Sequence, residues 1–330
     1  MKKFAQLILL PLFVIAVLLF MTTQRPADLA PGLESFGVTF SKPWAEELDL
    51  SWRGAYTAML DDLKVRHIRL PIYWSEVEKE PGTLDFIDSD WLVKEAAARN
   101  VKLILAVGRR LPRWPECHEP IWVKDKTQEE RDALLLKYLD GVIEHYKTEP
   151  AVVAWQVENE PFLSGFGVCP KLDEALLDKE IALVREKDKR PIILSDSGEL
   201  GLWLPAAKRA DIFGTTMYWT IWSGKIPGGY FRYPLIPQFF YFKANLVKHF
   251  AGTKDIIISE LQAEPWGPKQ IYDLEPAEQA KSMNLEKFKE NITFVRALGF
   301  REAYLWGVEW WYQEKILGRP EIWEEAKKLF

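Results

Sequence analysis

The chain has 330 residues, of which 48% are hydrophobic and 28% charged, and its formal net charge at pH 7 is -5. This composition is typical of a globular protein with a sizeable core, and the length suits one large domain with an appendage. No Lys/Arg cluster interleaves with aromatic residues, so we expect no nucleic-acid partner. The 4 His and 2 Cys residues show no close metal-ligand spacing, so we expect no bound metal.

The N-terminal segment, residues 1–21, is strongly hydrophobic. Lys2 and Lys3 precede an apolar run from Phe4 to Met21, which is about 18 residues long and spans a bilayer with little to spare. No clean small-residue cleavage site follows it. The positive-inside rule orients the rest of the chain outwards. We therefore predict an extracytoplasmic protein, anchored by this segment or secreted after its cleavage, with no other membrane contact.

A linker over residues 22–33, with Pro26, Pro31 and Gly32, leads into one predicted domain over residues 34–330. Short apolar runs bounded by turn residues predict strands in this domain. There are eight such runs: Ser35–Phe40, His67–Trp74, Lys102–Gly108, Val152–Glu160, Pro191–Ser197, Ile212–Trp219, Asp255–Glu264 and Glu302–Trp311.

Amphipathic segments between these strands predict helices. Examples are Trp91–Arg99, Gln128–Tyr146, Leu172–Lys187, Gln238–Phe250 and Glu278–Leu298. Strand and helix in regular alternation indicate a parallel α/β fold, and eight such units close into a (β/α)8 TIM barrel. An open nucleotide-binding sheet is disfavoured, because neither GxGxxG nor GxxxxGK[ST] occurs. In the barrel, catalytic side chains lie at the carboxyl ends of the strands.

Two of the predicted strands, the fourth and the seventh, end in glutamates, Glu160 and Glu260. Three steps around an eight-stranded ring separate these strands, so the two carboxylates face each other across the mouth of the barrel. Glycosidic bond cleavage needs such a pair, since one carboxyl protonates the leaving oxygen and the other attacks the sugar or activates water. The distance between them, which decides between retention and inversion, does not follow from the sequence.

Several motifs resemble those of known enzymes. Residues 155–160, Trp-Gln-Val-Glu-Asn-Glu, are similar to the acid/base segment of family 35 and 42 β-galactosidases, and the Asn-Glu-Pro ending is similar to that of family 5 cellulases. Residues 69–74 with residues 80–86, and Pro112-Arg113-Trp114, resemble other parts of the same superfamily. The chain thus resembles a clan A glycoside hydrolase, the superfamily of many cellulases, mannanases, xylanases and β-galactosidases.

This resemblance implies a retaining glycoside hydrolase that cleaves β-glycosidic bonds of an extracytoplasmic poly- or oligosaccharide without a cofactor. By the resemblance, Glu160 is the acid/base and Glu260 the nucleophile. Asn159 then binds the 2-hydroxyl group of the sugar.

Three further residues receive roles from the same resemblance. Arg69 positions the nucleophile, Tyr218 contacts it, and Trp306 forms a platform for the sugar. The chain departs from family 5 at Thr216, where a histidine usually precedes the tyrosine by two residues.

Several alternatives stay open at this point. A transglycosylase acting on envelope glycan would use the same residues, and a surface-anchored, non-catalytic carbohydrate-binding barrel is the rival of another class. Glu158 and Glu264 compete with the two chosen carboxylates. Cys117 and Cys169 fall in loops on the same face of the barrel, where they either form a disulfide or stay as thiols. The oligomeric state does not follow from the sequence.

Overall fold

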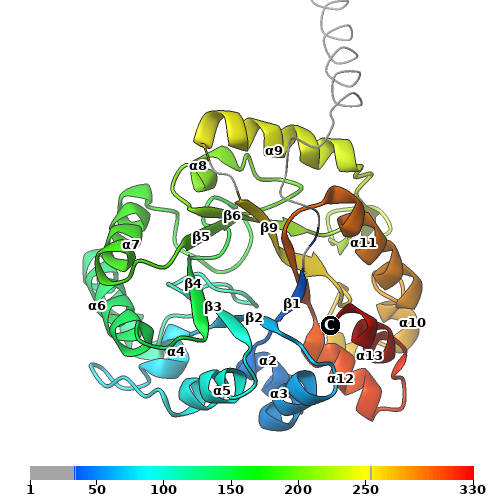
Figure 1. Cartoon of the computed structure of the whole chain (residues 1–330), viewed down its shortest axis with the longest axis horizontal. Coiled ribbons are helices and arrows are strands. Elements are labelled where there is room, and N and C mark those ends of the chain that lie inside the picture. The colour runs from blue at the N-terminus through cyan, green and yellow to red at the C-terminus, as the bar shows by residue number, and fades with distance from the viewer. Residues whose placement is uncertain (1–32, 34, 253–254) are drawn as a thin grey trace, which may run out of the picture.

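Figure 1 shows a computed structural model of the protein, which describes residues 33, 35–252 and 255–330. The predicted anchor, residues 1–21, and the predicted linker except Leu33 lie outside these residues. Within the described ranges, no helix is both long enough and apolar enough to cross a bilayer.

The central feature is a closed barrel of parallel strands, and all eight predicted strands belong to it. Its strands are β1 (Ser35–Thr39), β2 (His67–Pro71), β3 (Lys102–Val107), β4 (Val152–Val157), β5 (Ile192–Asp196), β6 (Ile212–Met217), β9 (Asp255–Gln262) and β10 (Glu302–Trp306). The order around the barrel is β1-β10-β9-β6-β5-β4-β3-β2. The predicted (β/α)8 fold is therefore confirmed.

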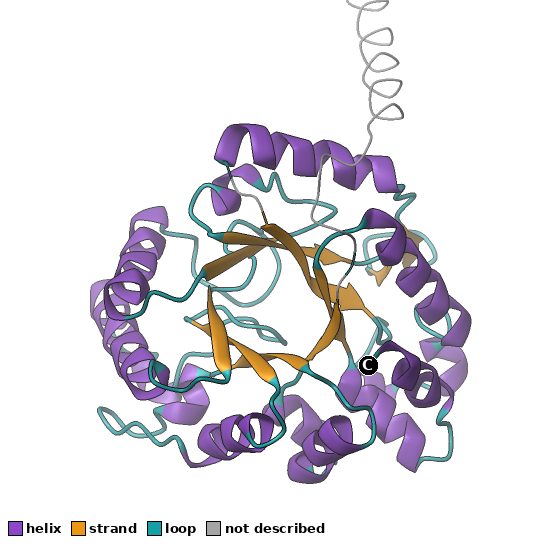
Figure 2. Cartoon of the chain, viewed as in Figure 1, coloured by secondary structure: helices purple, strands orange, loops and turns teal. Residues whose placement is uncertain are grey.

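Helices surround the barrel on its outside (Figure 2). The longer ones are α3 (Trp52–Asp61), α5 (Ile87–Ala97), α6 (Gln128–Tyr146), α7 (Glu174–Lys187), α9 (Pro237–Ala251), α11 (Leu285–Leu298) and α12 (Val308–Ile316). Shorter ones are α2 (Lys42–Glu47), α4 (Trp74–Val77), α8 (Leu204–Ala207), α10 (Pro276–Gln279) and α13 (Glu321–Ala326), with single 3-10 turns at Ile121–Val123, Ile271–Asp273 and Lys327–Leu329.

Two predicted elements differ from the structure. The strand predicted over Glu302–Trp311 ends at Trp306, because Gly307 adopts a positive φ of 123° and the chain enters α12. The helix predicted over Glu278–Leu298 is interrupted, and α11 starts only after Asn284, whose side chain caps it by accepting the backbone N–H of Lys287. The segment after β6 contains a small antiparallel hairpin of β7 (Thr220–Trp222) and β8 (Tyr230–Arg232).

Alternation along the strands sorts side chains between the helices and the inside of the barrel. Leu103 and Leu105 of β3 belong to the main core against the helices, whereas Ile104 between them belongs to a separate apolar cluster. That cluster also contains Ala154, Ile193, Ile257 and Tyr304. These residues fill the inside of the barrel, so polar residues further along the same strands are held at its carboxyl end.

One strand breaks this alternation. Along β9, Ile258 and Leu261 both belong to the core against the helices, although strict alternation would put them on opposite faces. The pairing register with β6 shifts there, from Thr215 opposite Ile258 to Thr216 opposite Glu260. The extra residue is a bulge, a device that re-aims side chains near active sites. As a result, Glu260 faces the inside of the barrel.

Two loops at the mouth are joined covalently. Cys117, in the loop after β3, forms a disulfide with Cys169, in the loop after β4, with a Cα–Cα distance of 5.3 Å. Val168 N–H donates to Pro115 O at 2.9 Å beside it. The guanidinium of Arg110 also donates to the carbonyls of Leu163 and Phe166, at 2.9 and 3.2 Å. Of the two alternatives for the cysteines, the structure has the disulfide.

We predict that Cys117→Ser/Cys169→Ser lowers the free energy of unfolding by about 2–4 kcal/mol. The bond closes a loop with a sequence separation of 52 residues, and the chain-entropy model gives a loop of that size about 4 kcal/mol. Urea unfolding of both proteins under oxidising conditions measures the difference. An unchanged midpoint and slope would contradict the prediction.

Candidate active site

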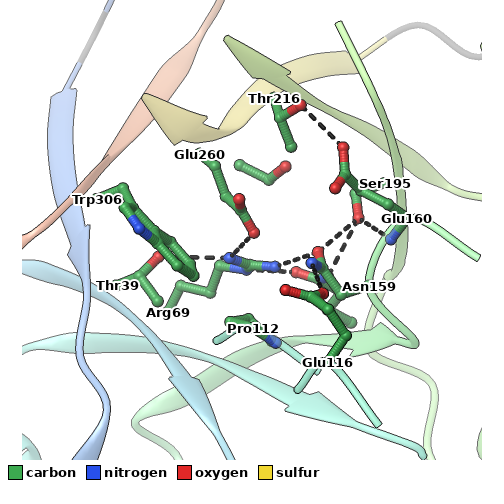
Figure 3. A network of polar contacts seen from close by, with 12 residues as sticks. Thr39, Arg69, Pro112, Glu116, Asn159, Glu160, Ser195, Thr216, Glu260 and Trp306 are labelled. Carbon is green, nitrogen blue, oxygen red and sulfur yellow. Dashed lines mark hydrogen bonds and ion pairs between the residues drawn. The ribbon is translucent and has the colours of Figure 1, made fainter. Parts of the chain in front are cut away.

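The buried guanidinium of Arg69 lies at the centre of the mouth (Figure 3). It is 0% exposed, and it donates to Glu260 Oε1 at 2.9 Å, to Asn159 Oδ1 at 2.7 Å and to Gln156 Oε1 at 2.6 Å. A weaker bond reaches Thr39 Oγ1 at 3.4 Å. Arg69 therefore joins side chains from β1, β4 and β9 with one planar group, and its charge is balanced by Glu260.

The second oxygen of Glu260 is also occupied. Tyr218, just after β6, donates its hydroxyl proton to Glu260 Oε2 at 2.8 Å. Burial and the negative charge of Glu260 raise the pKa of Tyr218 well above its ordinary value, so the tyrosine stays a donor. Glu260 is only 3% exposed and receives one charged and one neutral donor. Both of its oxygens are therefore fixed in position by hydrogen bonds.

The end of β4 is strained in a way that presents two consecutive side chains to the mouth. Glu158 and Glu160 both have positive φ values, 56° and 43°, which cost non-glycine residues about 1–3 kcal/mol each. The turn is held by the carboxylate of Glu158, which accepts the backbone N–H groups of Arg109 and Arg110 at 2.7 and 2.6 Å. Glu158 thus supports the turn and does not face the site.

Ser195 on β5 completes the support of this turn. Its hydroxyl donates to Asn159 Oδ1 at 3.1 Å and accepts from the backbone N–H of Glu160 at 3.0 Å. Gln156 Nε2 donates to the carbonyl of Glu158 at 3.0 Å. Asn159 therefore has its oxygen bound by Arg69 and Ser195, which directs its amide nitrogen towards the remaining space.

Glu160 is 6% exposed and lies in a different environment from Glu260. Burial, the charge of Glu260 and the nearby Glu116 raise its pKa well above the ordinary value. One bond opposes this effect, because Thr216 donates its hydroxyl proton to Glu160 Oε1 at 2.9 Å. Thr216 is the position at which the sequence departs from family 5, and the structure shows that it contacts the predicted acid/base.

A third carboxyl, Glu116, was not identified from the sequence. It follows the peptide between Trp114 and Pro115 in the disulfide-linked loop, and its Oε2 is 3.5 Å from the donor Asn159 Nδ2. Burial, followed by the charge of Glu260, raises its pKa to about 8. Its position beside Cys117, in a loop after a barrel strand, is the only sequence feature that pointed to it.

Trp306, at the end of β10, also lies at the mouth, but one of its ring faces is covered. The guanidinium carbon of Arg113 lies 4.2 Å from the ring centroid of Trp306. The indole N–H donates to Glu264 Oε1 at 2.8 Å, and Arg113 forms an ion pair with the same oxygen. Glu264 is therefore buried against Trp306.

The six predicted site residues thus come together at one end of the barrel. Figure 3 shows Arg69, Asn159, Glu160, Glu260 and Trp306 there, and Tyr218 is bonded to Glu260. Direct hydrogen bonds connect Arg69, Asn159, Glu260 and Tyr218. Ser195, Gln156, Glu116 and Arg113 are the supporting residues that sequence reasoning did not assign. In the described residues, no group of three or more His, Cys, Asp or Glu side chains is arranged to hold a metal ion.

Comparison with known proteins places this fold among glycoside hydrolase structures. The β-galactosidase of Rahnella sp. R3 aligns with a TM-score of 0.60 at 13% identity, over 91% of this chain and 55% of that one. Native xylanase 10B of Thermotoga maritima aligns with a TM-score of 0.55 at 14% identity, over 82% of both chains. GH5_18 of Streptomyces cattleya aligns with a TM-score of 0.55 at 12% identity, over 84% of this chain and 71% of that one.

These alignments confirm the predicted barrel fold. The chain spans about half the length of the Rahnella β-galactosidase. No protein-family model matches the sequence, and no curated protein matches it.

We predict that Glu116 makes the protein less stable as the pH rises from about 4.5 to about 8. Its folded-state pKa of about 8 lies above the ordinary value of 4.5, so the folded state binds the proton more strongly than the unfolded state over this range. Glu116→Gln removes that contribution. Urea unfolding at pH 5 and pH 8 should show the variant gaining stability relative to the wild type at pH 8. Glu80→Gln, at an exposed position, serves as control. The same change in unfolding free energy between pH 5 and pH 8 in all three proteins would contradict the prediction.

Proposed function

We propose that this protein is a retaining glycoside hydrolase that cleaves β-glycosidic bonds by double displacement, with Glu260 as nucleophile and Glu160 as acid/base. The observation that carries the proposal is the unequal environment of two carboxyls at one site. Glu260 accepts bonds from Arg69 and Tyr218, whereas burial and adjacent negative charge raise the pKa of Glu160 well above its ordinary value. Glycosidases use such pairs for acid and nucleophile.

In the first step, Glu260 attacks the anomeric carbon and the bond from that carbon to the leaving oxygen breaks. Glu160 gives its proton to that oxygen. A glycosyl ester on Glu260 results. In the second step, Glu160, now ionised, takes a proton from water, whose oxygen displaces Glu260 from the anomeric carbon. The charge on Glu260 disappears when the ester forms, which lowers the pKa of Glu160 and prepares it to act as the base.

The neighbouring residues have roles consistent with this cycle. Asn159, with its oxygen bound by Arg69 and Ser195, offers its amide nitrogen to the 2-hydroxyl group of the sugar. Hydrogen bonds to that hydroxyl strengthen in the transition state. The free part of the Trp306 ring supports an apolar sugar face. These residues do not require a cofactor.

The solved structures with the same fold support the reaction class, since they include xylanases and β-galactosidases. Transfer to a sugar acceptor of envelope glycan would use the same ester. A non-catalytic carbohydrate-binding barrel has no need for Glu260, Arg69 and Tyr218 in this arrangement, so we favour the enzyme.

We also propose that the substrate is a poly- or oligosaccharide outside the cytoplasm. Lys2 and Lys3 before an apolar run support export of the chain. The disulfide between Cys117 and Cys169 supports the same location, because disulfides persist mainly in oxidising compartments.

We predict that Glu160→Ala and Glu260→Ala each lower kcat on aryl β-glycosides by at least about 10²-fold, the lower bound for loss of general acid–base catalysis. Added azide separates the roles. It should give a glycosyl azide of retained configuration with Glu160→Ala and of inverted configuration with Glu260→Ala. Proton NMR of the product should show retention for the wild type. Inversion by the wild type, or full activity of either variant, would contradict the mechanism.

We predict that Thr216→Val moves the alkaline limb of the kcat/KM profile to higher pH. Thr216 donates to the carboxylate of Glu160, so its loss raises the pKa of the acid. A neutral hydrogen bond of this kind changes a pKa by roughly half to one unit. Thr215→Val is the matched control, because the Thr215 hydroxyl donates to the carbonyl of Thr216 at 3.1 Å and does not contact Glu160. A shift to lower pH, or equal shifts in both variants, would refute the assignment.

A further inference from the structure

The site has one side for the leaving group and one for the attacked sugar. Because Glu160 protonates the leaving oxygen, the leaving group lies on the side of β4. The attacked sugar then lies on the opposite side, where β10 stands across the barrel from β4 in the strand order. Figure 3 shows Glu160 and Trp306 at opposite ends of the site, with Glu260 and Arg69 between them. Any further sugar on the glycone side would have to pass Trp306.

Arg113 crosses the mouth of the barrel on the side of the attacked sugar. It belongs to the loop after β3, yet its side chain spans the mouth to Glu264, after β9, and to Glu309 in α12, at 3.0 Å from Glu309 Oε2. Its guanidinium carbon lies 4.7 Å from the ring centroid of Trp44, after β1, as well as beside Trp306. The five residues of this Arg113 cluster, Trp44, Arg113, Glu264, Trp306 and Glu309, are all buried.

The cluster is tied to the rest of the barrel by its own bonds. Glu309 Oε1 accepts the backbone N–H of Ser41, just after β1, at 2.5 Å. Tyr73, after β2, donates to the carbonyl of Pro112 at 2.9 Å and so fixes the residue before Arg113. Buried ion pairs and hydrogen bonds therefore cross-link the segments after β1, β2, β3, β9 and β10 on this side of the site.

Within this cluster, three buried atoms lack a hydrogen-bond partner, namely Trp44 Nε1, Arg113 Nε and Glu264 Oε2, and of these only Glu264 Oε2 is an acceptor. Glu264 Oε1 accepts from Arg113 and Trp306, whereas Glu264 Oε2 is buried without a hydrogen bond. An unpaired buried carboxylate oxygen costs about 1–3 kcal/mol or more. Gly307 lies against Glu264 with φ 123°, and a Cβ there would lie 2.5 Å from Glu264 Cβ and 3.1 Å from Oε2, so the absence of a side chain at Gly307 makes room for Glu264. A hydroxyl group of a sugar is a suitable donor.

We infer that Glu264 binds hydroxyl groups at the non-reducing end of the attacked sugar, and that the Arg113 cluster confines the enzyme to releasing single sugars from chain ends. The inference rests on the proposed function, whose two carboxylates define which side holds the glycone. It assigns the substrate class as non-reducing termini of β-linked glycans. Glu264 is then a residue that determines specificity, and Arg113 is a positioning residue that orients it.

The first experiment uses the full-length protein in detergent with β-linked gluco-, manno-, xylo- and galacto-hexasaccharides labelled at the reducing end. Each is supplied free and with a 4-O-methyl cap on its terminal sugar. The labelled free hexamer of the accepted sugar should shorten by one residue at a time, and its capped form should react at least 100-fold more slowly. Internal fragments from free and capped hexamers at similar rates would overturn the inference and leave the hydrolase proposal intact. No cleavage of any hexamer or aryl glycoside, at the level of Glu160→Gln, would refute both.

The second experiment tests whether Glu264 binds a hydroxyl group of the sugar. We measure kcat/KM of the wild type and Glu264→Gln on an aryl β-monoglycoside and on its 4-deoxy and 6-deoxy analogues. The variant should lose at least tenfold on the parent sugar and much less on the deoxy sugar that lacks its partner hydroxyl. A purely structural loss would be the same on every sugar, and that result would overturn the role of Glu264.

Glu302→Gln is the matched control for the comparison of Glu264→Gln with the wild type. Glu302 lies at the other end of β10 from Trp306, where it accepts the hydroxyl of Tyr304 at 2.7 Å. Its kcat/KM values should equal those of the wild type on all three sugars. The experiment with capped hexamers uses the wild type alone, so its result does not depend on the folding of Glu264→Gln.

Discussion

The arrangement of the site depends on one buried cation. A guanidinium with no exposed surface inside a barrel needs both an anion and neutral acceptors, because its desolvation is otherwise uncompensated. Arg69 meets this need with Glu260, Asn159 and Gln156. The same three bonds set the distance between β4 and β9 side chains at the mouth. Arg69 thus fixes Glu260 relative to Asn159, the residue before Glu160, and removing any partner disturbs the others.

The two central carboxyls show how one small region supports two protonation states. Glu260 receives a charged donor and a phenol, whereas Glu160 receives only the Thr216 hydroxyl and a backbone support from Ser195. Burial and the charge on Glu260 raise the pKa of Glu160. The backbone at the end of β4 is strained to reach this arrangement. Glu158 and Glu160 adopt the left-handed conformation there, and the side chains of Asn159 and Glu160 both lie at the mouth of the barrel.

The sequence predicted the parts of this structure that follow from periodicity and strand ends. Eight apolar runs separated by amphipathic segments were enough for the barrel, and Glu160 and Glu260 followed from their positions after strands four and seven. The bulge that turns Glu260 inwards was not predictable, since it depends on register with β6. The positions of Arg113 and Glu116 in the site were not predictable either, because their partners lie far away in the chain. Gly307 ended the last strand early, a local backbone effect that an apolar run does not reveal.

The loop after β3 explains why such distant contacts matter. Within ten residues it places Arg110 on two carbonyls of the next loop, Arg113 in the far cluster, Glu116 beside Asn159, and Cys117 in the disulfide. A loop with that many fixed points has little freedom to move independently of the barrel. Its side chains therefore act as part of the scaffold. Under the proposed function, this preorganised loop sets the substrate preference, and a change of preference needs coordinated changes in the loop and in the residues after β9 and β10 that it contacts.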